Sequence, residues 1–391
     1  MKIHVIAFLG LMGCSFFALA QKDFQKKYQS AMILAEPGSV IELPEGTFTL
    51  SNTLSLDGKK NVTIRGRGMD KTFLSFKGQT DGAEGILISD GENILLEGFT
   101  VQDAKGDGIK ARNVKGIHFS QVKAEWTGIP GPKNGGYGLY PVQCENVLID
   151  RCVAIGASDA GIYVGQSKDI IVKHSTAHHN VAGIEIENSL RADVFGNEAY
   201  DNAGGLLVFD LPDLVLKRGG QVKVHHNKIH DNNHVNFAPK GNIVATVPSG
   251  TGILILAAKE VEVYQNEIRN NQSMGTGIIS YLTTGIPIKD KEYDPFTSAI
   301  HIHDNIYERK NGLPIGNDPI NSLVGKKFGE NVPHIVYDGI KNPALLDANG
   351  KWLAGHCITI LNNKDQSIVN LDASNNFKEM ARADHAFTCN Y

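Results

Sequence analysis

Aromatic residues and positive charge are both scarce in this chain of 391 residues. Phe, Tyr and Trp together make up 7% of the sequence, and the formal net charge at pH 7 is −4. No run of Lys and Arg is present, so we expect no nucleic-acid partner. With 42 glycines and few aromatic side chains, the composition fits a core of stacked Ile, Val and Leu.

Long apolar runs are absent after residue 20, so we expect no membrane-spanning segment. Residues 1–20 have the features of a signal peptide: a positively charged start, an apolar stretch, and Ala18-Leu-Ala20 before Gln21. We therefore expect a periplasmic or secreted protein that begins at Gln21. The alternative is a lipoprotein anchored at Cys14, because Leu11-Met-Gly-Cys14 resembles a lipoprotein box.

Cysteine is also rare, with five in the chain. If Cys14 is removed with the signal peptide, four remain: Cys144, Cys152, Cys357 and Cys389. An even number in an exported chain permits disulfides. A Cys357–Cys389 bond could hold the C-terminal tail to the body. Cys144 and Cys152 flank one strand and fit equally well as small core residues. No Cys and His spacing matches a closed zinc site.

A short repeat dominates the middle of the chain. Gly161-Ile-Tyr-Val, Gly183-Ile-Glu-Ile and Gly205-Leu-Leu-Val follow one another at intervals of 22 residues, with further short apolar segments between them. Strands this short cannot close a core alone, but each can pair with its equivalent one coil away, about 4.8 Å along an axis. The repeat therefore predicts an all-β fold, a right-handed parallel β-helix of about ten coils. We expect it to be a monomer.

The repeat divides the chain into four expected parts. The signal peptide is followed by an N-terminal cap with the first strands over residues 21–56. The parallel β-helix then occupies residues 57–309, and an irregular C-terminal extension that caps the solenoid occupies residues 310–391. Because a solenoid has no natural internal boundary, we expect one elongated domain.

Two departures from the repeat carry further expectations. At the N-terminal end, apolar spacing predicts a capping helix over residues 23–35. Its apolar side comprises Phe24, Tyr28, Ala31 and Leu34. Later, the interval from Gly205 to Gly252 is 47 residues long, which predicts one extra coil together with protruding loops.

Two parts of the sequence resemble known β-helix proteins. The segment Gly38-Ser-Val-Ile-Glu-Leu-Pro-Glu-Gly-Thr47 is similar to the start of pectin-lyase-like proteins. The later repeats, over residues 157–166, 181–189, 204–212 and 247–252, resemble bacterial exported proteins with right-handed parallel β-helix repeats. Such proteins are related to a carbohydrate-binding and sugar-hydrolase β-helix group. The resemblance implies the fold and a polysaccharide or oligosaccharide partner.

One outward face of the repeat gathers charged and aromatic residues. Alternate residues of a strand face outward, so the glycine-containing strands present a column from coil to coil. The catalytic candidates on or beside this face are Lys110, Tyr140, Tyr163, Glu185, Glu187 and Asp159. Arg112 and Phe209 are the candidates for substrate binding. Ordinary cross-strand pairing on a sheet surface is the structural alternative.

Two reactions on a sugar polymer fit these residue types. Loss of a C5 proton from a uronic acid needs a cation, a base and an acid, which Lys110 or Arg112 and the tyrosines could supply. Hydrolysis needs two carboxyl groups, and Glu185 and Glu187 are two residues apart on one strand. We expect lyase or C5-epimerase chemistry on a uronate-containing polysaccharide. A non-catalytic glycan-binding or structural protein is the alternative, because the sequence lacks the Asn-Thr-Asp, Asp-Pro-His and Trp-x-Asp-His motifs of polygalacturonases, mannuronan epimerases and pectate lyases.

Seven histidines occur near turns of the repeat: His174, His178, His179, His225, His226, His230 and His234. They allow a second alternative, a periplasmic metal-loading factor, which a related β-helix group suggests. Stacked Asn and His side chains at equivalent turns also satisfy backbone groups, and we favour this structural interpretation. We expect no resident cofactor, with Ca²⁺ left open because acidic sugars and carboxylates bind it together.

Overall fold

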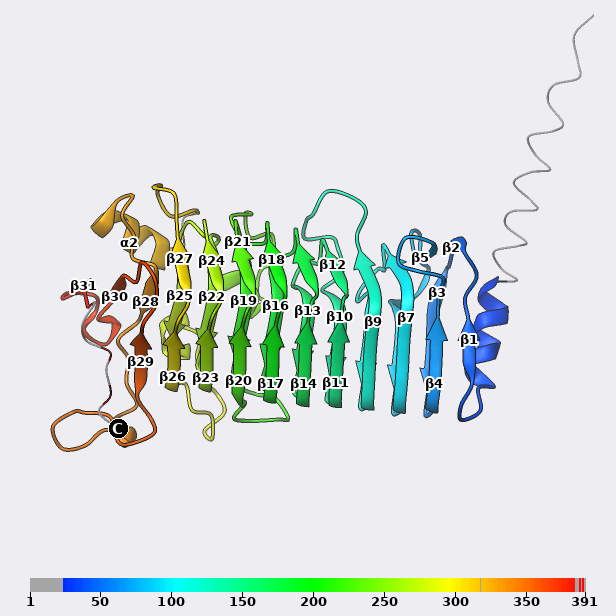
Figure 1. The fold of residues 1–391 in the computed structure, drawn as a ribbon, viewed down its shortest axis with the longest axis horizontal. Coiled ribbons are helices and arrows are strands. Elements are labelled where there is room, and N and C mark those ends of the chain that lie inside the picture. Colours follow the sequence, from blue (N-terminus) through cyan, green and yellow to red (C-terminus); the bar gives the residue numbers. More distant parts are fainter. Residues whose placement is uncertain (1–23, 317, 384–386, 388, 390–391) are drawn as a thin grey trace, which may run out of the picture.

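The backbone winds into one elongated solenoid (Figure 1). The structure, a computed structural model, describes residues 24–316, 318–383, 387 and 389. Each coil contributes short strands that pair in parallel with the coils before and after it. The parallel β-helix predicted from the repeat is therefore confirmed. The expected signal peptide and the Cys14 alternative lie outside the described residues.

Two hydrogen-bonded sheets run along the solenoid. In the described part of the chain, sheet I has 12 strands and sheet II has 19. Sheet I consists of β3 (Asn52–Asp57), β6 (Asp81–Ser89), β8 (Ile109–Arg112), β10 (Tyr137–Val142), β13 (Ala160–Gly165), β16 (Ala182–Glu187), β19 (Gly204–Phe209), β22 (Thr251–Leu256), β25 (Met274–Ile279), β28 (Ile335–Tyr337), β30 (Ile368–Asn370) and the antiparallel β31 (Ala381–Arg382).

Sheet II has two arms, because β7 (Glu92–Gln102) and β9 (Lys115–Glu125) continue through the corner between them. The first arm also holds β1 (Val40–Glu42), β4 (Lys60–Arg65), β11 (Glu145–Asp150), β14 (Lys168–Lys173), β17 (Leu190–Phe195), β20 (Gly220–His225), β23 (Lys259–Tyr264), β26 (Ser298–His303) and β29 (Ile358–Leu361). The second arm holds β2 (Gly46–Thr49), β5 (Thr72–Ser75), β12 (Val153–Ile155), β15 (Thr176–His178), β18 (Glu198–Tyr200), β21 (Lys228–His230), β24 (Glu267–Arg269) and β27 (Ile306–Glu308).

Apolar side chains and asparagine ladders fill the interior. Ile162, Ile184 and Leu206 pair in register and are completely buried, which confirms the predicted inward stack. At two turns, each buried asparagine oxygen accepts the backbone N–H of its equivalent one coil earlier. The two ladders are Asn180, Asn202, Asn232, Asn271 and Asn197, Asn227, Asn266, Asn305, Asn363. They satisfy backbone groups that strands this short leave unpaired inside the turns.

A helix over residues 24–33 covers the N-terminal end of the core (Figure 1). Phe24, Tyr28 and Met32 are buried, and the Phe24 ring lies 3.9 Å from that of Phe48, centroid to centroid. The predicted capping helix is confirmed, but Leu34 was wrongly placed on its apolar face, since it is 73% exposed. The helix ends at residue 33, so helical spacing does not extend to Leu34.

After residue 310 the coils continue with irregular additions. β29 pairs with β26, and β28 and β30 extend sheet I. Helix α2 (Pro319–Phe328) packs through Val324 against the end of this sheet, and two 3₁₀ helices, η3 (Pro343–Leu345) and η4 (Ala373–Asn375), follow. Cys357 and Cys389 form a disulfide, whereas Cys144 and Cys152 are free and buried as small core residues.

Insertions between strands lie over the outer face of sheet I. β19 pairs directly with β22, so the extra coil predicted between Gly205 and Gly252 is wrong. Two insertions, residues 210–219 and 231–250, account for the long interval instead. The second carries the 3₁₀ helix η1 (Ile243–Thr246), and residues 280–297 form a third insertion with η2 (Tyr281–Thr284).

Candidate active site

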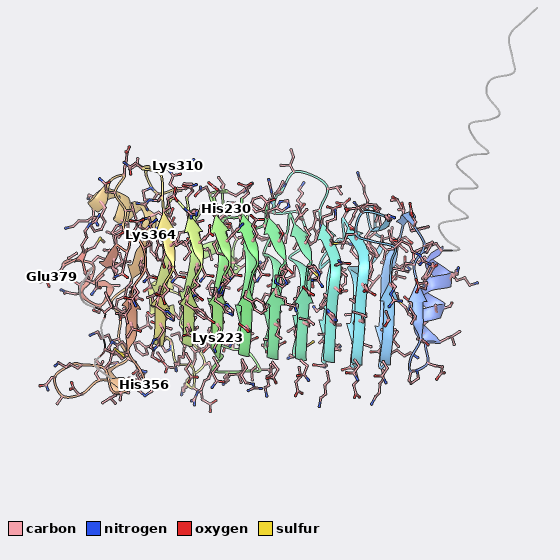
Figure 2. The ribbon with its side chains drawn as sticks, in the orientation of Figure 1. Lys223, His230, Lys310, His356, Lys364 and Glu379 are labelled. Atoms are coloured by element: carbon pink, nitrogen blue, oxygen red, sulfur yellow. A yellow bond between two sulfur atoms is a disulfide. The ribbon has the colours of Figure 1, made fainter. Side chains whose placement is uncertain are left out.

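The outer face of sheet I is buried along its middle. Every residue of β13, β16, β19, β22 and β25 is buried, whereas sheet II strands alternate between buried and exposed. On β20, for example, Lys223 is exposed (Figure 2). The outward side chains Leu207 and Phe209 are apolar and pack under Val244 and Val247 of the second insertion. This part of the outward face is therefore covered and not open to water, because outward apolar residues are stabilised by being covered.

Four successive strands carry most of the candidate residues. Lys110 on β8 pairs with Tyr140 on β10, and Tyr163 on β13 pairs with Glu185 on β16. With about 4.8 Å per coil, Lys110 lies about 14 Å from Glu185 along the axis. Arg112 pairs with Val142, Val142 with Gly165, and Gly165 with Glu187. Arg112 is therefore also three coils from Glu187. The cations and the glutamates therefore occupy opposite ends of one patch.

Three tyrosines fill the centre of this patch. The rings of Tyr137, Tyr140 and Tyr163 contact one another, with centroids 4.5, 4.6 and 4.9 Å apart. The Lys110 ammonium lies 4.6 Å from the centroid of the Tyr140 ring and 3.5 Å from Asp107 Oδ2. Burial raises the pKa of all three phenols, so they are protonated hydrogen-bond donors at neutral pH.

Tyr163 and Glu187 are joined across one coil. The Tyr163 hydroxyl donates a hydrogen bond to Glu187 Oε1 at 2.5 Å. Its ring lies over Gly165, where an added Cβ would come within 2.2 Å of the phenol oxygen. Burial raises the pKa of Glu187 to about 7, against the hydrogen bond from Tyr163, which lowers it.

Asp159 is held by two donors from distant parts of the sequence. Its Oδ2 accepts a hydrogen bond from the Tyr137 hydroxyl at 3.3 Å and from Asn242 Nδ2 at 3.2 Å. Burial raises its pKa to about 7, while the Asn242 and Tyr137 hydrogen bonds oppose the shift. Asp159 and Glu187 are each 7% exposed. Both carboxyls are thus partly protonated and partly ionised near neutral pH.

Glu185 is more deeply buried than these two carboxyls. It is 1% exposed, and its Oε2 has no hydrogen-bond partner. Burial, followed by the charges of Glu187 and Asp159, raises its pKa well above the usual range. Burial therefore favours the protonated, uncharged form of Glu185.

The structure separates the other candidates from this acidic site. Phe209 is 2% exposed and packs in the apolar cluster under the second insertion, so it does not present a surface to a substrate. Arg112 is exposed at the end of β8. Lys110 is half-buried next to Asp107 and Glu84.

Sequence reasoning missed Tyr137, Asn242 and Asp107. Tyr137 comes before Gly138, and the outward positions were counted only after the glycine of each coil. A second tyrosine so near Tyr140 was a sign that it belongs to the same site. Asn242 lies on an insertion 83 residues from Asp159, and nothing in the repeat connects the two. Asp107 comes one residue before the glycine of its coil, and Asp159 comes two residues before the glycine of a later coil. This similarity in position could have identified Asp107 as a candidate.

Three of the seven histidines stack on aromatic rings at the ends of sheet II strands, whereas the predicted backbone hydrogen bonds of the ladders are made by the asparagines. The His178 ring stacks on Tyr200, and Tyr200 stacks on His230, with centroids 4.9 and 5.4 Å apart. His225 stacks in the same way between Phe195 and Tyr264. In the described part of the chain, no group of three or more His, Cys, Asp or Glu side chains is arranged to hold a metal ion.

The fold and the repeat together define a class of protein, the right-handed parallel β-helices. The model of the family "Right handed beta helix region" matches residues 54–211 and 116–291. The chain belongs to this family.

Individual relatives are distant. The preneck appendage proteins of Bacillus phages PZA and phi29 are each 24% identical, over 65% and 62% of this chain. The chain spans about a third of the length of these relatives, 33% and 32%. Among solved structures, the A-module of the mannuronan C-5 epimerase AlgE4 from Azotobacter vinelandii is similar, with 15% identity and a TM-score of 0.50. This similarity covers 89% of this chain and 91% of that one, and it shows the fold alone.

Helices are few and short in this fold. No helix in the part of the chain that the structure describes has the length and apolar character needed to cross a membrane.

Proposed function

We propose that the chain is a carbohydrate-active enzyme that hydrolyses a uronate-containing polysaccharide, with Asp159 and Glu187 as its two catalytic carboxyls. The observation that carries this is their shared setting: each carboxyl is 7% exposed and accepts a hydrogen bond from one of two tyrosines, Tyr137 and Tyr163, whose rings contact each other. Burial raises the pKa of both carboxyls to about 7. Glycosidic-bond hydrolysis uses one protonated carboxyl as the acid and one ionised carboxyl as the base or nucleophile. Two carboxyls that titrate near neutral pH supply both forms at once.

The tyrosines assist these carboxyls as donors. Tyr163 and Tyr137 each donate to one carboxyl, so each phenol stabilises the ionised form of its partner. Because their own pKa values are raised, neither tyrosine serves as a base at neutral pH. The protonated form of Glu185, which burial favours, limits the negative charge at the site.

The cations bind substrate at a distance from the reaction. A coil rises by about 4.8 Å, close to the length of one sugar unit in an extended chain, so Lys110 and Arg112 meet a sugar about three units from the cleaved bond. Uronate carboxylates are the groups that these side chains recognise, Arg in bidentate fashion. This division explains why Lys110 pairs with Glu84 and Asp107 and not with the two catalytic carboxyls, although all of them share one face.

Access to the carboxyls involves the second insertion. Asn242 is exposed, yet its amide donates to Asp159. A sugar that approaches Asp159 must replace this hydrogen bond, so we infer that the Asn242 side chain turns away from Asp159 when substrate enters.

C5-proton chemistry is the second candidate, which the Tyr163–Glu187 hydrogen bond favours. Glu187 would take the C5 proton and a phenol would return one. An enediolate formed at Glu187 also needs a nearby positive charge. Among the described residues, the hydrogen-bond and ion-pair partners found for Asp159, Glu185 and Glu187 include no Lys or Arg. This difference places hydrolysis first.

Purified protein incubated with a panel of uronate and neutral polysaccharides tests the proposal. New reducing ends report hydrolysis, ultraviolet absorbance of an unsaturated uronate reports elimination, and deuterium uptake at C5 in D₂O reports epimerisation. We expect reducing ends from a uronate polymer, abolished in Glu187→Gln and Asp159→Asn. Glu145→Gln, an exposed carboxyl on β11, is the matched control and should retain activity.

Other results would contradict the proposal in distinct ways. Elimination or deuterium exchange that depends on Glu187 would establish the second candidate. Binding without any product, unchanged in both variants, would establish a non-catalytic glycan-binding protein.

A further inference from the structure

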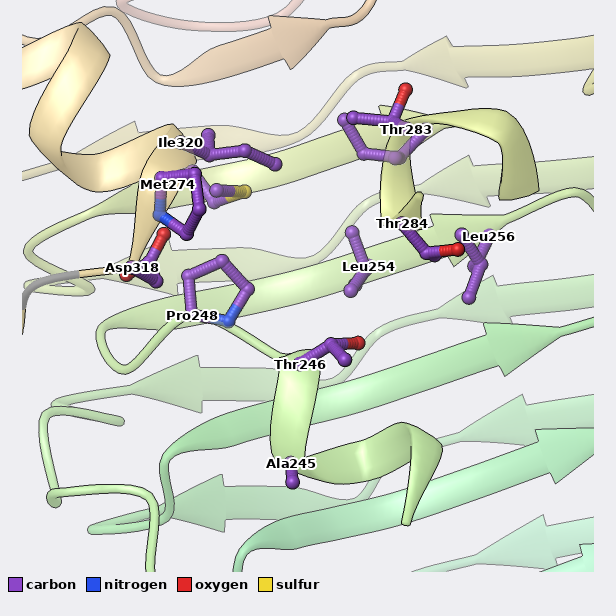
Figure 3. A pocket seen from close by; sticks show the side chains of 12 residues that line it. Ala245, Thr246, Pro248, Leu254, Leu256, Met274, Thr283, Thr284, Asp318 and Ile320 are labelled. Carbon is purple, nitrogen blue, oxygen red and sulfur yellow. The ribbon is translucent and has the colours of Figure 1, made fainter. Parts of the chain in front are cut away.

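A pocket of about 340 Å³ lies on the outer face of sheet I, where the second and third insertions meet the start of α2 (Figure 3). Two strands contribute Leu254 and Leu256 from β22 and Met274 and Ile279 from β25. The surrounding segments contribute Ala245, Thr246 and Pro248 near η1, Thr283 and Thr284 of η2, and Asp318, Pro319 and Ile320 at the start of α2. No residue of the acidic site lines this pocket.

The size of the pocket sets it apart from a packing defect. Protein interiors leave few voids larger than one water molecule. A cavity of about 150 Å³ already holds a benzene molecule, and this pocket is about twice as large. Since segments from three separate parts of the chain enclose it, the pocket has the character of a preformed ligand site.

The chemistry of its lining selects an uncharged ligand. None of the lining residues is Lys, Arg or His, so an anion would find no counter-charge there. The only carboxyl is that of Asp318, which caps α2 by accepting from the Asn321 N–H at 2.9 Å. The pocket therefore differs from the cationic end of the patch at Lys110 and Arg112.

The three threonine hydroxyls can act toward a ligand only as acceptors. Thr246 and Thr284 donate to backbone carbonyls of their own helical turns, each at 2.7 Å. Thr283 donates to Asp338 Oδ2 at 2.9 Å. A ligand that fits is thus apolar, uncharged, and able to donate a hydrogen bond at its polar end.

The register of sheet I relates the pocket to the acidic site. Leu254 pairs with Leu207, and Leu207 pairs with Glu185, so the pocket lies two coils, about 10 Å, from the acidic site along the axis. We propose that the pocket binds an uncharged, ring-sized aryl substituent carried by the sugar polymer about two units from the carboxyls, with hydroxyls of the adjoining sugar donating to the threonines. That a sugar polymer carries the bound group rests on the proposed function, whereas the presence of an apolar binding site does not.

Fluorescence titration and calorimetry with 2-naphthol and 2-naphthyl β-glucoside test this proposal without any reaction. We expect both to bind saturably at one site, the glucoside at least as tightly as the naphthol. Ala245→Phe, which fills the pocket, should weaken both by at least about tenfold. Lys240→Phe adds the same ring at an exposed position of the same insertion outside the pocket and should leave binding unchanged. Thr246→Trp narrows the pocket from an exposed position if Ala245→Phe does not fold.

Three outcomes would overturn the inference. The first is the absence of saturable binding by either probe, and the second is binding that Ala245→Phe and Thr246→Trp leave intact. The third is binding of 2-naphthol with exclusion of the glucoside, which would show a site for free apolar molecules. A failed polysaccharide panel with intact glucoside binding would contradict the proposed reaction but not this site.

Discussion

The Tyr163 hydroxyl reaches over Gly165 to donate a 2.5 Å hydrogen bond to Glu187 on the next coil. Gly165 and Glu187 are direct partners in sheet I, so the phenol crosses the position where a side chain would otherwise stand. Glycine at this position is thus required by the ring above it, and not by backbone strain.

Gly165→Ala should break this hydrogen bond. The added Cβ would lie 2.2 Å from the phenol oxygen and 2.3 Å from Cε1, so the buried ring must move. Glu187 then loses a donor that lowers its pKa, and we expect that pKa to rise further, as Tyr163→Phe should also cause. Carbon-13 NMR titration of the Glu187 carboxyl measures the shift.

A double-mutant cycle provides the control for that prediction. If Gly165→Ala acts by displacing the phenol, its effect on the Glu187 pKa should vanish in the Tyr163→Phe background. Tyr264→Phe, in the aromatic stack of sheet II, should leave Glu187 unchanged. Additive effects of the two changes would mean that Gly165 acts by another route.

The buried carboxyls should make the protein less stable as pH rises. The folded-state pKa of Asp159 and Glu187, about 7, lies above the unfolded value of about 4. Between these values the folded state binds more protons, so the free energy of unfolding falls as pH increases from about 4 to about 7. Glu185, with its pKa well above the usual range, extends the fall to higher pH.

Glu185→Gln tests this dependence, because it keeps the shape of the side chain and removes its charge. The melting temperature of the variant relative to the unchanged protein should increase steadily from pH 5 to pH 9, by several degrees overall. Glu145→Gln, an exposed change of the same kind, should show a flat difference. A flat difference for Glu185→Gln as well would mean that its carboxyl titrates normally.

The fold was predictable because the repeat itself encodes it. Ile162, Ile184 and Leu206 recur at one interval, and stacking is the only way to bury strands so short. The asparagine and histidine turns were predictable for the same reason, since equivalent positions in successive coils become neighbours. The Tyr140 and Tyr163 contact followed from this register too.

Whether the outer face of sheet I is covered or exposed could not be predicted from the spacing of the repeat. Alternation in a strand shows which residues leave the solenoid, but it does not show whether an insertion covers them. Leu207 and Phe209 carried the missing signal, because apolar outward residues imply a cover. Asn242 carried none, since its contact with Asp159 depends on how a loop without a repeat folds back.

The asparagine ladders should contribute strongly to stability. Asn232 accepts from the Asn202 N–H at 3.2 Å and donates to the Ala199 carbonyl at 3.0 Å. Asn232→Ala leaves these buried groups unpaired, and each costs about 1–3 kcal/mol. We expect urea unfolding to show a loss of several kcal/mol, against almost none for the exposed Asn331→Ala. A loss below about 1 kcal/mol would indicate that water replaces the amide.

Substrate binding and catalysis should separate at Arg112. This side chain is exposed, so Arg112→Ala should leave the melting temperature unchanged while it removes a charged hydrogen bond to a uronate, worth about 1.5–3 kcal/mol. Since Arg112 lies three coils from Glu187, KM for a uronate polymer should rise with little change in kcat, and high salt should reduce the difference.

A disaccharide that occupies only the site at Glu187 cannot reach Arg112, so its cleavage should not respond to the change. Lys223→Ala removes an exposed cation from sheet II and should affect neither substrate. An equal loss of kcat for the disaccharide would place Arg112 at the reacting sugar, and the separation of cations from carboxyls along the solenoid would then not describe how substrate lies on this face.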